Sequence, residues 1–235
     1  MSTYNPLVDH QGDISRKMKA IKEYRERTLP ETVTNYWRAK LGIDGKRAGV
    51  NIVVPDCDWT QEEINRSMVR RGGRELAGRM LYLPEELIGK EGLIRLGKMY
   101  PGLRGEKAEG SYTLEDKTQV TNIYDTYGWI KVEATSIAPN RNTTEEELRR
   151  FAEEQGYNMQ REAVYILASL ANKDLTGEFF DEGGKIWSRL GGSRGEGGVI
   201  AACFYSDGHL RVLLALDPMQ RDEHYGGRFE QTRRR

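Results

Sequence analysis

The segment from Val199 to Leu216 constrains the fold more than any other part of the sequence. Val199–Tyr205 and His209–Leu216 are rich in residues that favour strands. Asp207-Gly208 between them is typical of a two-residue hairpin turn. Apolar residues occupy both faces near 212–216, so we expect inner strands of a sheet rather than an exposed edge. The sequence therefore predicts a core β-hairpin at 199–216.

A second hairpin is predicted at 119–137, with residues 125–128 as a four-residue connection. Its second strand alternates apolar residues with polar ones, which include Lys131 and Glu133. Such alternation is typical of a strand with one face in the core and the other in water. We therefore expect these two side chains to be exposed.

Two helices are expected to cover the sheet. Thr144 and Glu147 have the spacing of a capping box, which predicts a helix at 144–155. The next helix, at 158–172, has the widest apolar face in the chain and is the expected central helix of the core. Helices and hairpins follow one another without a regular βαβ pattern. The predicted fold class is therefore α+β, with an antiparallel sheet packed against these helices.

Residues 1–45 are predicted to form an N-terminal helical arm, and residues 46–235 an α+β globular domain. Helices are expected at 13–27 and 30–41, where apolar residues recur at helical spacing. Both apolar stripes are narrow, so the arm should pack against something else, either the main domain or another subunit. An arm of this kind is a simple way for a chain to hold a neighbouring copy.

Charge and hydropathy exclude several classes of protein. The 36 basic and 36 acidic residues cancel, so no overall field attracts nucleic acid or an anionic membrane. No apolar run approaches the roughly 20 residues that a membrane helix needs, and the first residues do not resemble a secretory signal. Two cysteines are too few for a disulfide framework. We therefore expect a soluble, cytoplasmic protein with reduced thiols and no membrane partner.

The segment Pro55–Trp59 is one candidate for chemistry. It follows a strand predicted at 50–54, and ligand sites often lie at such positions. Asp56 and Asp58 have the groups to hold a metal or act as acid and base, but they are equally typical of turns and helix caps. The two carboxylates should raise the pKa of Cys57 between them, which argues against this thiol as a nucleophile.

The last third of the sequence gathers three further candidates, Cys203, His209 and His224. With Asp207-Gly208 as a two-residue turn, Cys203 lies opposite Val212 and on the other face of the sheet from His209. This register argues against a catalytic Cys–His pair, and Cys203 is expected to be a small core residue. His224 matches no zinc-ligand spacing, and the polar segment that contains it is predicted to be a solvated tail.

The glycine-rich stretch 191–198 has the composition of a phosphate-binding loop, but its residues and the elements around it do not follow the order found in such loops. A P-loop ends in Lys followed by Ser or Thr and opens a helix, whereas this stretch precedes the strand at Val199. We interpret it as a flexible connection into the hairpin. The remaining hypothesis is that Arg194 and the neighbouring amides contact an anionic partner.

Basic residues are densest at 66–79. Together with the C-terminal arginines they form a candidate contact to phosphates. No aromatic residue lies between Trp59 and Tyr82 to stack on bases, and a solvated surface or an interface to the acidic stretch 144–162 explains the charges as well. The candidate contacts in this region are Arg66, Arg70, Arg71 and Arg74.

No linear motif specifies a catalytic centre, and none predicts a metal or a cofactor. The sequence therefore favours a non-enzymatic structural or protein-interaction protein that self-associates through its N-terminal arm, with another copy or another protein as its partner. One alternative is a small hydrolase or transferase whose Asp56, Asp58, His209 and His224 meet only in the fold. A cleft that joins the two aspartates to a histidine would support this alternative. Nucleic-acid binding by 66–79 and the C-terminal arginines is the third hypothesis.

Overall fold

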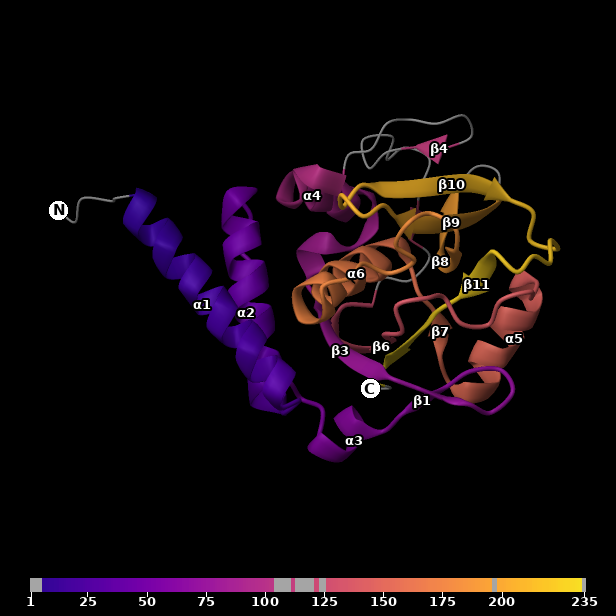
Figure 1. Cartoon of the computed structure of the whole chain (residues 1–235), viewed down its shortest axis with the longest axis horizontal. Coiled ribbons are helices and arrows are strands. Elements are labelled where there is room, and N and C mark those ends of the chain that lie inside the picture. Colours follow the sequence, from indigo (N-terminus) through magenta and orange to yellow (C-terminus); the bar gives the residue numbers. More distant parts are fainter. Residues whose placement is uncertain (1–5, 104–110, 113–120, 123–125, 196–197, 234–235) are drawn as a thin grey trace.

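The computed structural model describes residues 6–103, 111–112, 121–122, 126–195 and 198–233 (Figure 1). Within these ranges, no helix has the length and apolar character needed to cross a membrane. The helices are α1 (Pro6–Glu26), α2 (Pro30–Arg47), α3 (Gln61–Asn65), α4 (Gly89–Met99), α5 (Glu145–Gln155) and α6 (Glu162–Thr176), with short 3-10 helices η1 (Glu85–Leu87) and η2 (Pro101–Leu103).

Two β-sheets form the body of the molecule, beside a small β1–β2 ladder. The six-stranded sheet has the order β11–β8–β9–β10–β4, with β5 also paired to β8, and the four-stranded sheet has the order β3–β6–β12–β7. Every described pair is antiparallel except β11 with β8. The strands are β1 (Met68–Val69), β2 (Glu75–Leu76), β3 (Gly78–Leu83), β4 (Ser111–Tyr112), β5 (Thr121–Asn122), β6 (Gly128–Glu133), β7 (Asn158–Met159), β8 (Trp187–Gly195), β9 (Gly198–Phe204), β10 (Leu210–Leu216), β11 (Tyr225–Gly227) and β12 (Phe229–Thr232).

The predicted α+β class is confirmed, and so are its two covering helices. The Thr144 side chain accepts from the N–H of Glu147 at 3.2 Å, and Gly156 ends α5 in a left-handed conformation. α6 starts at Glu162, because residues 158–159 form β7. α6 lies in the middle of the molecule (Figure 1), and its residues from Glu162 to Ser169 are all buried. It is the central core helix that its apolar face predicts.

The predicted hairpin at 199–216 is also confirmed. Its strands are β9 and β10, which lie inside the six-stranded sheet between β8 and β4. The ladder differs from the expectation by one residue, because Cys203 pairs with Arg211 rather than with Val212. Cys203 therefore shares a face of the sheet with Arg211, and it is buried as predicted.

The difference in register comes from the loop of this hairpin. The N–H of Tyr205 donates to the C=O of His209, so the loop has three residues instead of the expected two. Gly208, with φ at 92°, occupies the left-handed position that closes hairpin loops of this length. One additional loop residue moves every cross-strand pair by one position.

In the described residues, the two strands predicted as a hairpin at 119–137 do not pair with each other. β5 pairs with β8 in the six-stranded sheet, whereas β6 belongs to the four-stranded sheet. β6 has β3 on one edge and β12 on the other, so its edges are occupied by strands from elsewhere in the chain. Residues 113–120 and 123–125 lie outside the described part of the chain.

Lys131 and Glu133 on β6 are buried, contrary to the expectation of an exposed face. The ammonium of Lys131 donates to the C=O groups of Glu63, at 2.6 Å, and of Arg66. Burial, aided by the charge of Arg66, lowers the pKa of Lys131 to about 8. Alternation in a sequence shows which residues share a face, but here the polar face meets other parts of the chain instead of water.

Arg228 connects the two sheets. Its guanidinium lies 2.7 Å from the Glu133 carboxylate of the four-stranded sheet and 3.0 Å from Asp181, and its Nε donates to Ser188 of the six-stranded sheet at 2.8 Å. The polar segment from Asp217 onwards is therefore a solvated tail only in part. Most of residues 217–224 are exposed, as their composition predicts, whereas the following residues supply β11 and β12, and Arg228 and Glu230 are buried and paired with charged residues of the body.

The glycine-rich stretch 191–198 is not a flexible connection. Residues 191–195 continue β8, which pairs with β9, and residues 196–197 lie outside the described chain. A Cβ at position 191 would collide with the side chain of Met159. Glycine is needed there because another strand packs closely against the backbone, which composition alone does not show.

The segment 50–54, predicted as a strand, is extended but belongs to none of the sheets in the described chain. Its backbone is held by α2 instead, because the Nε of Arg38 donates to the C=O of Val54 at 2.9 Å. Ile52 and Val54 are buried. The β-branched run thus reflects burial against the helix and not a place in a sheet.

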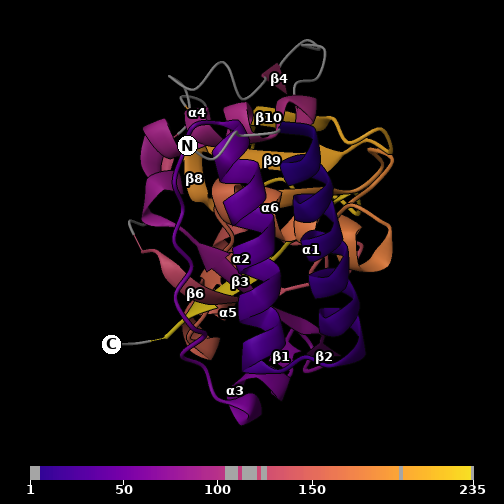
Figure 2. The same cartoon turned by 90° about the vertical axis from the view of Figure 1, so that its left-hand side faces the viewer.

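The N-terminal helical arm consists of α1 and α2, which lie side by side on one side of the body (Figure 2). Val33, Tyr36 and Trp37 of α2 belong to the main hydrophobic core. The indole N–H of Trp37 donates to the C=O of Met80 in β3 at 3.0 Å. The arm was expected to pack against either the main domain or another subunit, and in the structure it packs against the main domain. The division of the chain into two domains stays a prediction.

Candidate functional site

Two of the four predicted catalytic residues, Asp56 and Asp58, line one pocket of about 540 Å³. The pocket lies where the loop 55–58 meets the ends of β3, β6 and β12. No histidine is among the described residues that line it. The lining residues with functional groups include Asp56, Asp58, Tyr82, Tyr127, Trp129 and Arg233.

The backbone of the loop 55–58 is held from two sides. Thr34 on α2 accepts a hydrogen bond from the N–H of Cys57 at 2.9 Å. On the other side, the indole N–H of Trp129 donates to the C=O of Asp56 at 3.0 Å. The helical arm and the four-stranded sheet together therefore fix the position of the two aspartates.

The carboxylates of Asp56 and Asp58 lie at the rim of the pocket, with 90% and 64% of their side chains exposed. Arg38 lies 3.1 Å from the Asp56 carboxylate. Arg233, which follows β12, lies 3.8 Å from the Asp58 carboxylate and 3.2 Å from that of Glu63. Exposed ion pairs of this kind contribute less than about 1 kcal/mol each. Both carboxylates therefore remain available to a ligand.

Two aromatic rings form the inner wall of the pocket. Tyr82 on β3 and Trp129 on β6 are partners in the antiparallel ladder, so their side chains lie on the same face. The ring centroids are 5.2 Å apart, and both side chains are buried. Burial, followed by the charge of Glu86 and the effects of Tyr127 and Glu85, raises the pKa of the Tyr82 phenol. The phenol therefore stays neutral and the ring is an electron-rich surface.

The remaining wall is the turn at 126–128. Arg161 donates to the C=O of Thr126 at 2.7 Å, which fixes the start of the turn. Gly128 has φ at 105°, a conformation that side chains with a Cβ rarely adopt. Tyr127, between them, is among the exposed large hydrophobic residues.

The groups around this pocket suit binding better than covalent chemistry. Burial raises the pKa of the nearby Cys57 thiol to about 11, and the charge of Asp58 adds to the effect. A thiol with that pKa is protonated near neutral pH and is a poor nucleophile. The raised pKa agrees with the sequence-based expectation, although burial and not charge repulsion is its main cause.

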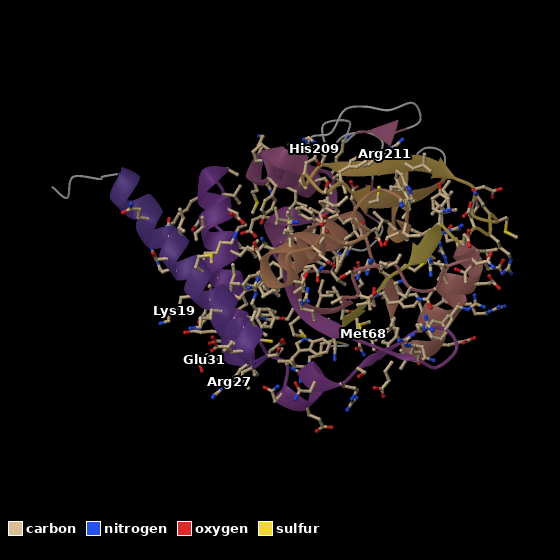
Figure 3. The ribbon with its side chains drawn as sticks, in the orientation of Figure 1. Lys19, Arg27, Glu31, Met68, His209 and Arg211 are labelled. Atoms are coloured by element: carbon tan, nitrogen blue, oxygen red, sulfur yellow. The ribbon has the colours of Figure 1, made fainter. Side chains whose placement is uncertain are left out.

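The two predicted histidines lie elsewhere. Figure 3 shows His209 at the upper edge of the molecule, where its Nδ1 lies 2.9 Å from the Asp207 carboxylate. The Nδ1 of His224, just before β11, lies 2.8 Å from Asp222. Burial raises the pKa of Cys203 to about 12. The structure therefore brings the two aspartates together without a histidine, which is half of the Asp–His site that the hydrolase or transferase hypothesis predicted.

Two of the predicted phosphate contacts have carboxylate partners within the chain. Arg66 pairs with Glu62 and Arg71 with Glu147, each at 3.4 Å. These pairs reduce the positive charge that the two arginines offer to a phosphate, and nucleic-acid binding stays a prediction. Of the other candidates, Arg70 is half-buried, Arg74 is exposed, and the side chain of Arg194 lies outside the described part.

Sequence reasoning missed the aromatic half of the pocket. Tyr82 and Trp129 appear in the sequence as ordinary strand residues, and only the β3–β6 register shows that they are adjacent. Arg233 was considered for phosphates, whereas it contacts carboxylates. The available signal is that Tyr127-Gly128-Trp129 lies where a loop enters a strand, and loops held by a rigid scaffold often carry binding residues.

A second candidate site is the outer face of α1. Ile14 and Met18 are 48% and 60% exposed, and they are neighbours on the helix surface because they are four residues apart. Further along α1, Ile21 and Tyr24 are buried in the main core. The apolar stripe predicted at 13–27 thus continues from the core onto an exposed surface.

Comparisons with known proteins add no function. No protein-family model matches the chain, and no curated protein or solved structure is significantly similar to it. In the described residues, no group of three or more His, Cys, Asp and Glu side chains is placed to hold a metal ion.

Proposed function

We propose that the protein is a non-enzymatic protein-interaction protein that self-associates through the outer face of α1. The observation that carries this proposal is the exposure of Ile14 and Met18 on a helix whose next turns are fixed in the core. A rigid helix that presents adjacent apolar side chains is the common element of helix-to-helix association. Its charged neighbours point outwards, as Figure 3 shows for Lys19.

A second copy suits this face because an antiparallel pair of α1 helices brings their exposed apolar side chains together. With the two-fold axis level with Arg16, Ile14 of one copy lies beside Met18 of the other. Arg16 itself lies on the opposite side of the helix from Ile14 and Met18, because residues two apart do not share a helix face, and it pairs with Asp13 of its own chain at 2.7 Å.

The dimer should be weak. A contact limited to the turns of α1 around Ile14 and Met18 buries less surface than the roughly 800 Å² per partner that is typical of stable complexes. We therefore expect a dissociation constant of about 0.1 to 1 mM. Self-association at this level is detectable and depends on protein concentration.

Sedimentation velocity from about 10 µM to about 1 mM tests the proposal. The wild-type weight-average mass should rise with concentration, and the double substitution Ile14→Ser with Met18→Ser should abolish the rise. Met219→Ser is the matched control, because Met219 is equally exposed but lies far from α1 in the sequence. It should leave the concentration dependence unchanged.

A wild-type protein that stays monomeric over the whole range overturns the proposal. So does a dimer that persists in the Ile14→Ser, Met18→Ser variant.

A further inference from the structure

We propose that the pocket formed by Asp56, Asp58, Tyr82 and Trp129 binds an alkylammonium cation, the chemistry of a lysine side chain and its N-methylated forms. This site is separate from the outer face of α1 and does not depend on self-association. Three features carry the inference: the two aromatic rings, the two exposed carboxylates, and the guanidinium that already occupies the rim.

The aromatic rings supply the first feature. The ring centroids of Tyr82 and Trp129 are 5.2 Å apart and the interplanar angle is 57°, so the two rings are inclined to each other and not stacked. Rings at such an angle form adjacent walls of a cage. Aromatic faces attract cations within about 6 Å of the ring centre, and ammonium ions with apolar substituents are the ligands that aromatic cages recognise.

The carboxylates supply the second feature. Asp56 and Asp58 lie at the mouth of the pocket, and their backbone positions are fixed by hydrogen bonds from Trp129 and from Arg233. Fixed carboxylates beside an aromatic wall favour a positive charge on the ligand and disfavour a negative one. Burial raises the pKa of Tyr82, and the charges of Glu86 and Glu85 add to the effect, so further carboxylates act on this ring.

Arg233 supplies the third feature. Its guanidinium lies at the rim and contacts the C=O of Asp58 and the carboxylate of Glu63, the latter at 3.2 Å. A cation from this chain is therefore already accommodated by the carboxylates beside the pocket. Arg233 faces two carboxylates, Asp58 and Glu63, so this cluster carries a net negative charge that disfavours an anionic ligand.

The size of the site fits an ammonium group with its alkyl chain. The pocket volume of about 540 Å³ lies within the usual range of small-molecule sites. This volume is larger than a bare inorganic cation fills. The apolar walls can therefore contact only a ligand that carries carbon substituents beside its charge. A lysine side chain has both a charged head and an apolar stem.

Isothermal titration calorimetry tests the proposal with three cations: tetramethylammonium, choline, and Nα-acetyl-lysine methylamide, which keeps its ε-ammonium group. We expect dissociation constants in the range of about 1 to 10 mM. The uncharged isostere of choline, 3,3-dimethylbutanol, should bind at least about tenfold more weakly than choline itself, because it fills the same space without the charge. Raising the salt concentration should weaken binding of the cations only.

Variants locate the site. Asp56→Asn combined with Asp58→Asn should weaken cation binding by about fivefold to tenfold, and both positions are exposed enough to leave the fold intact. Tyr82→Leu should also weaken it, with circular dichroism as the check on folding. Glu153→Gln, at an exposed carboxylate on α5, is the matched control and should bind as the wild type does.

Three results overturn the proposal. Equal binding of choline and its uncharged isostere shows a simple apolar pocket. Tighter binding of phenyl phosphate than of tetramethylammonium shows an anion site centred on Arg233. Cation binding that is unchanged in both the Asp56→Asn, Asp58→Asn and the Tyr82→Leu variants places the interaction elsewhere on the molecule.

Discussion

Glu147 shows how much one side chain does in this fold. Its carboxylate accepts from the N–H of Thr144 at 2.9 Å, which closes the capping box of α5. The same carboxylate lies 2.8 Å from Arg221 and 3.4 Å from Arg71. The bond from the Thr144 backbone, then that from Arg221, lowers the pKa of Glu147 to about 2. A single residue thus joins a helix start to two distant segments.

The lowered pKa of Glu147 predicts a specific dependence of stability on pH. The folded state favours the charged carboxylate, so its contribution is complete above the ordinary pKa of 4.5 and is lost as the pH falls toward about 2. Glu147→Gln keeps a capping-box side chain but removes the charge, and should cost roughly 1 kcal/mol at pH 6. Urea unfolding of both proteins measures the difference, which should narrow between pH 5 and about 2.5. A difference that stays constant over this range contradicts the assignment.

At the scale of elements, two helical glycines have opposite roles. Gly92 in α4 is buried, and a Cβ there would collide with the backbone of Leu87 in η1. Gly42 in α2 has open space where its Cβ would lie. Helix propensity assigns both glycines the same cost, about 1 kcal/mol relative to alanine. Packing therefore decides which of them is needed.

Alanine substitution should separate these roles by sign. Gly42→Ala should stabilise the protein by about 0.5 to 1 kcal/mol, because it gains helix propensity and meets no neighbour. Gly92→Ala should destabilise it by about 2 kcal/mol, because the new methyl pushes α4 away from η1. The free energy of unfolding in urea gives both values. A stabilised Gly92→Ala variant would show that the α4–η1 contact does not require glycine, and a destabilised Gly42→Ala variant would contradict the open space at position 42.

The elements also show what could be predicted from the sequence. Helix α5 was predictable because Thr144, Glu147 and Gly156 are local signals that act within one turn. Strand partners that are distant in the sequence were not predictable, because they are chosen across the whole chain: β6 pairs with β3 and β12, and nothing near residue 128 indicates either. The hairpin β9–β10 was found from its turn, yet one additional loop residue changed its register.

The same distinction explains the candidate pocket. Asp56 and Asp58 stood out because they flank a cysteine in five residues, so their proximity is a property of local sequence. Tyr82 lies on β3, Trp129 on β6 and Arg233 directly after β12, and only the four-stranded sheet brings them together. A site whose residues are brought together by strand register cannot be recognised before that register is known.

At the scale of the whole molecule, the arm is held to the body by an ionic contact around Asp174 of α6. Its carboxylate lies 2.7 Å from the ammonium of Lys40, accepts from the Tyr36 hydroxyl at 3.0 Å, and lies 3.6 Å from Lys17. Arg25 donates to the C=O of Asp174 at 2.5 Å. Although burial acts to raise it, Lys40 and Lys17 hold the pKa of Asp174 below its ordinary value.

Asp174→Ala should therefore loosen the arm. The substitution leaves the buried ammonium of Lys40 without its closest carboxylate, which should cost about 3 kcal/mol. Lys17→Ala removes a more exposed and longer contact and should cost less than about 1 kcal/mol. Urea unfolding measures both, and hydrogen exchange in α1 should rise only in Asp174→Ala. Equal losses in the two variants contradict a central role for Asp174.

The place of β12 in the four-stranded sheet sets the order in which the protein can be completed during synthesis. Glu133 on β6 and Arg228 beside β12 are 95 residues apart. When a ribosome has made β6, one of its edges can pair with β3, but the strand for its other edge does not yet exist. Unpaired strand edges are templates for association with other chains. A nascent chain of this protein therefore carries an open sheet edge and an uncompensated acid at Glu133 until β12 is made and inserts between β6 and β7.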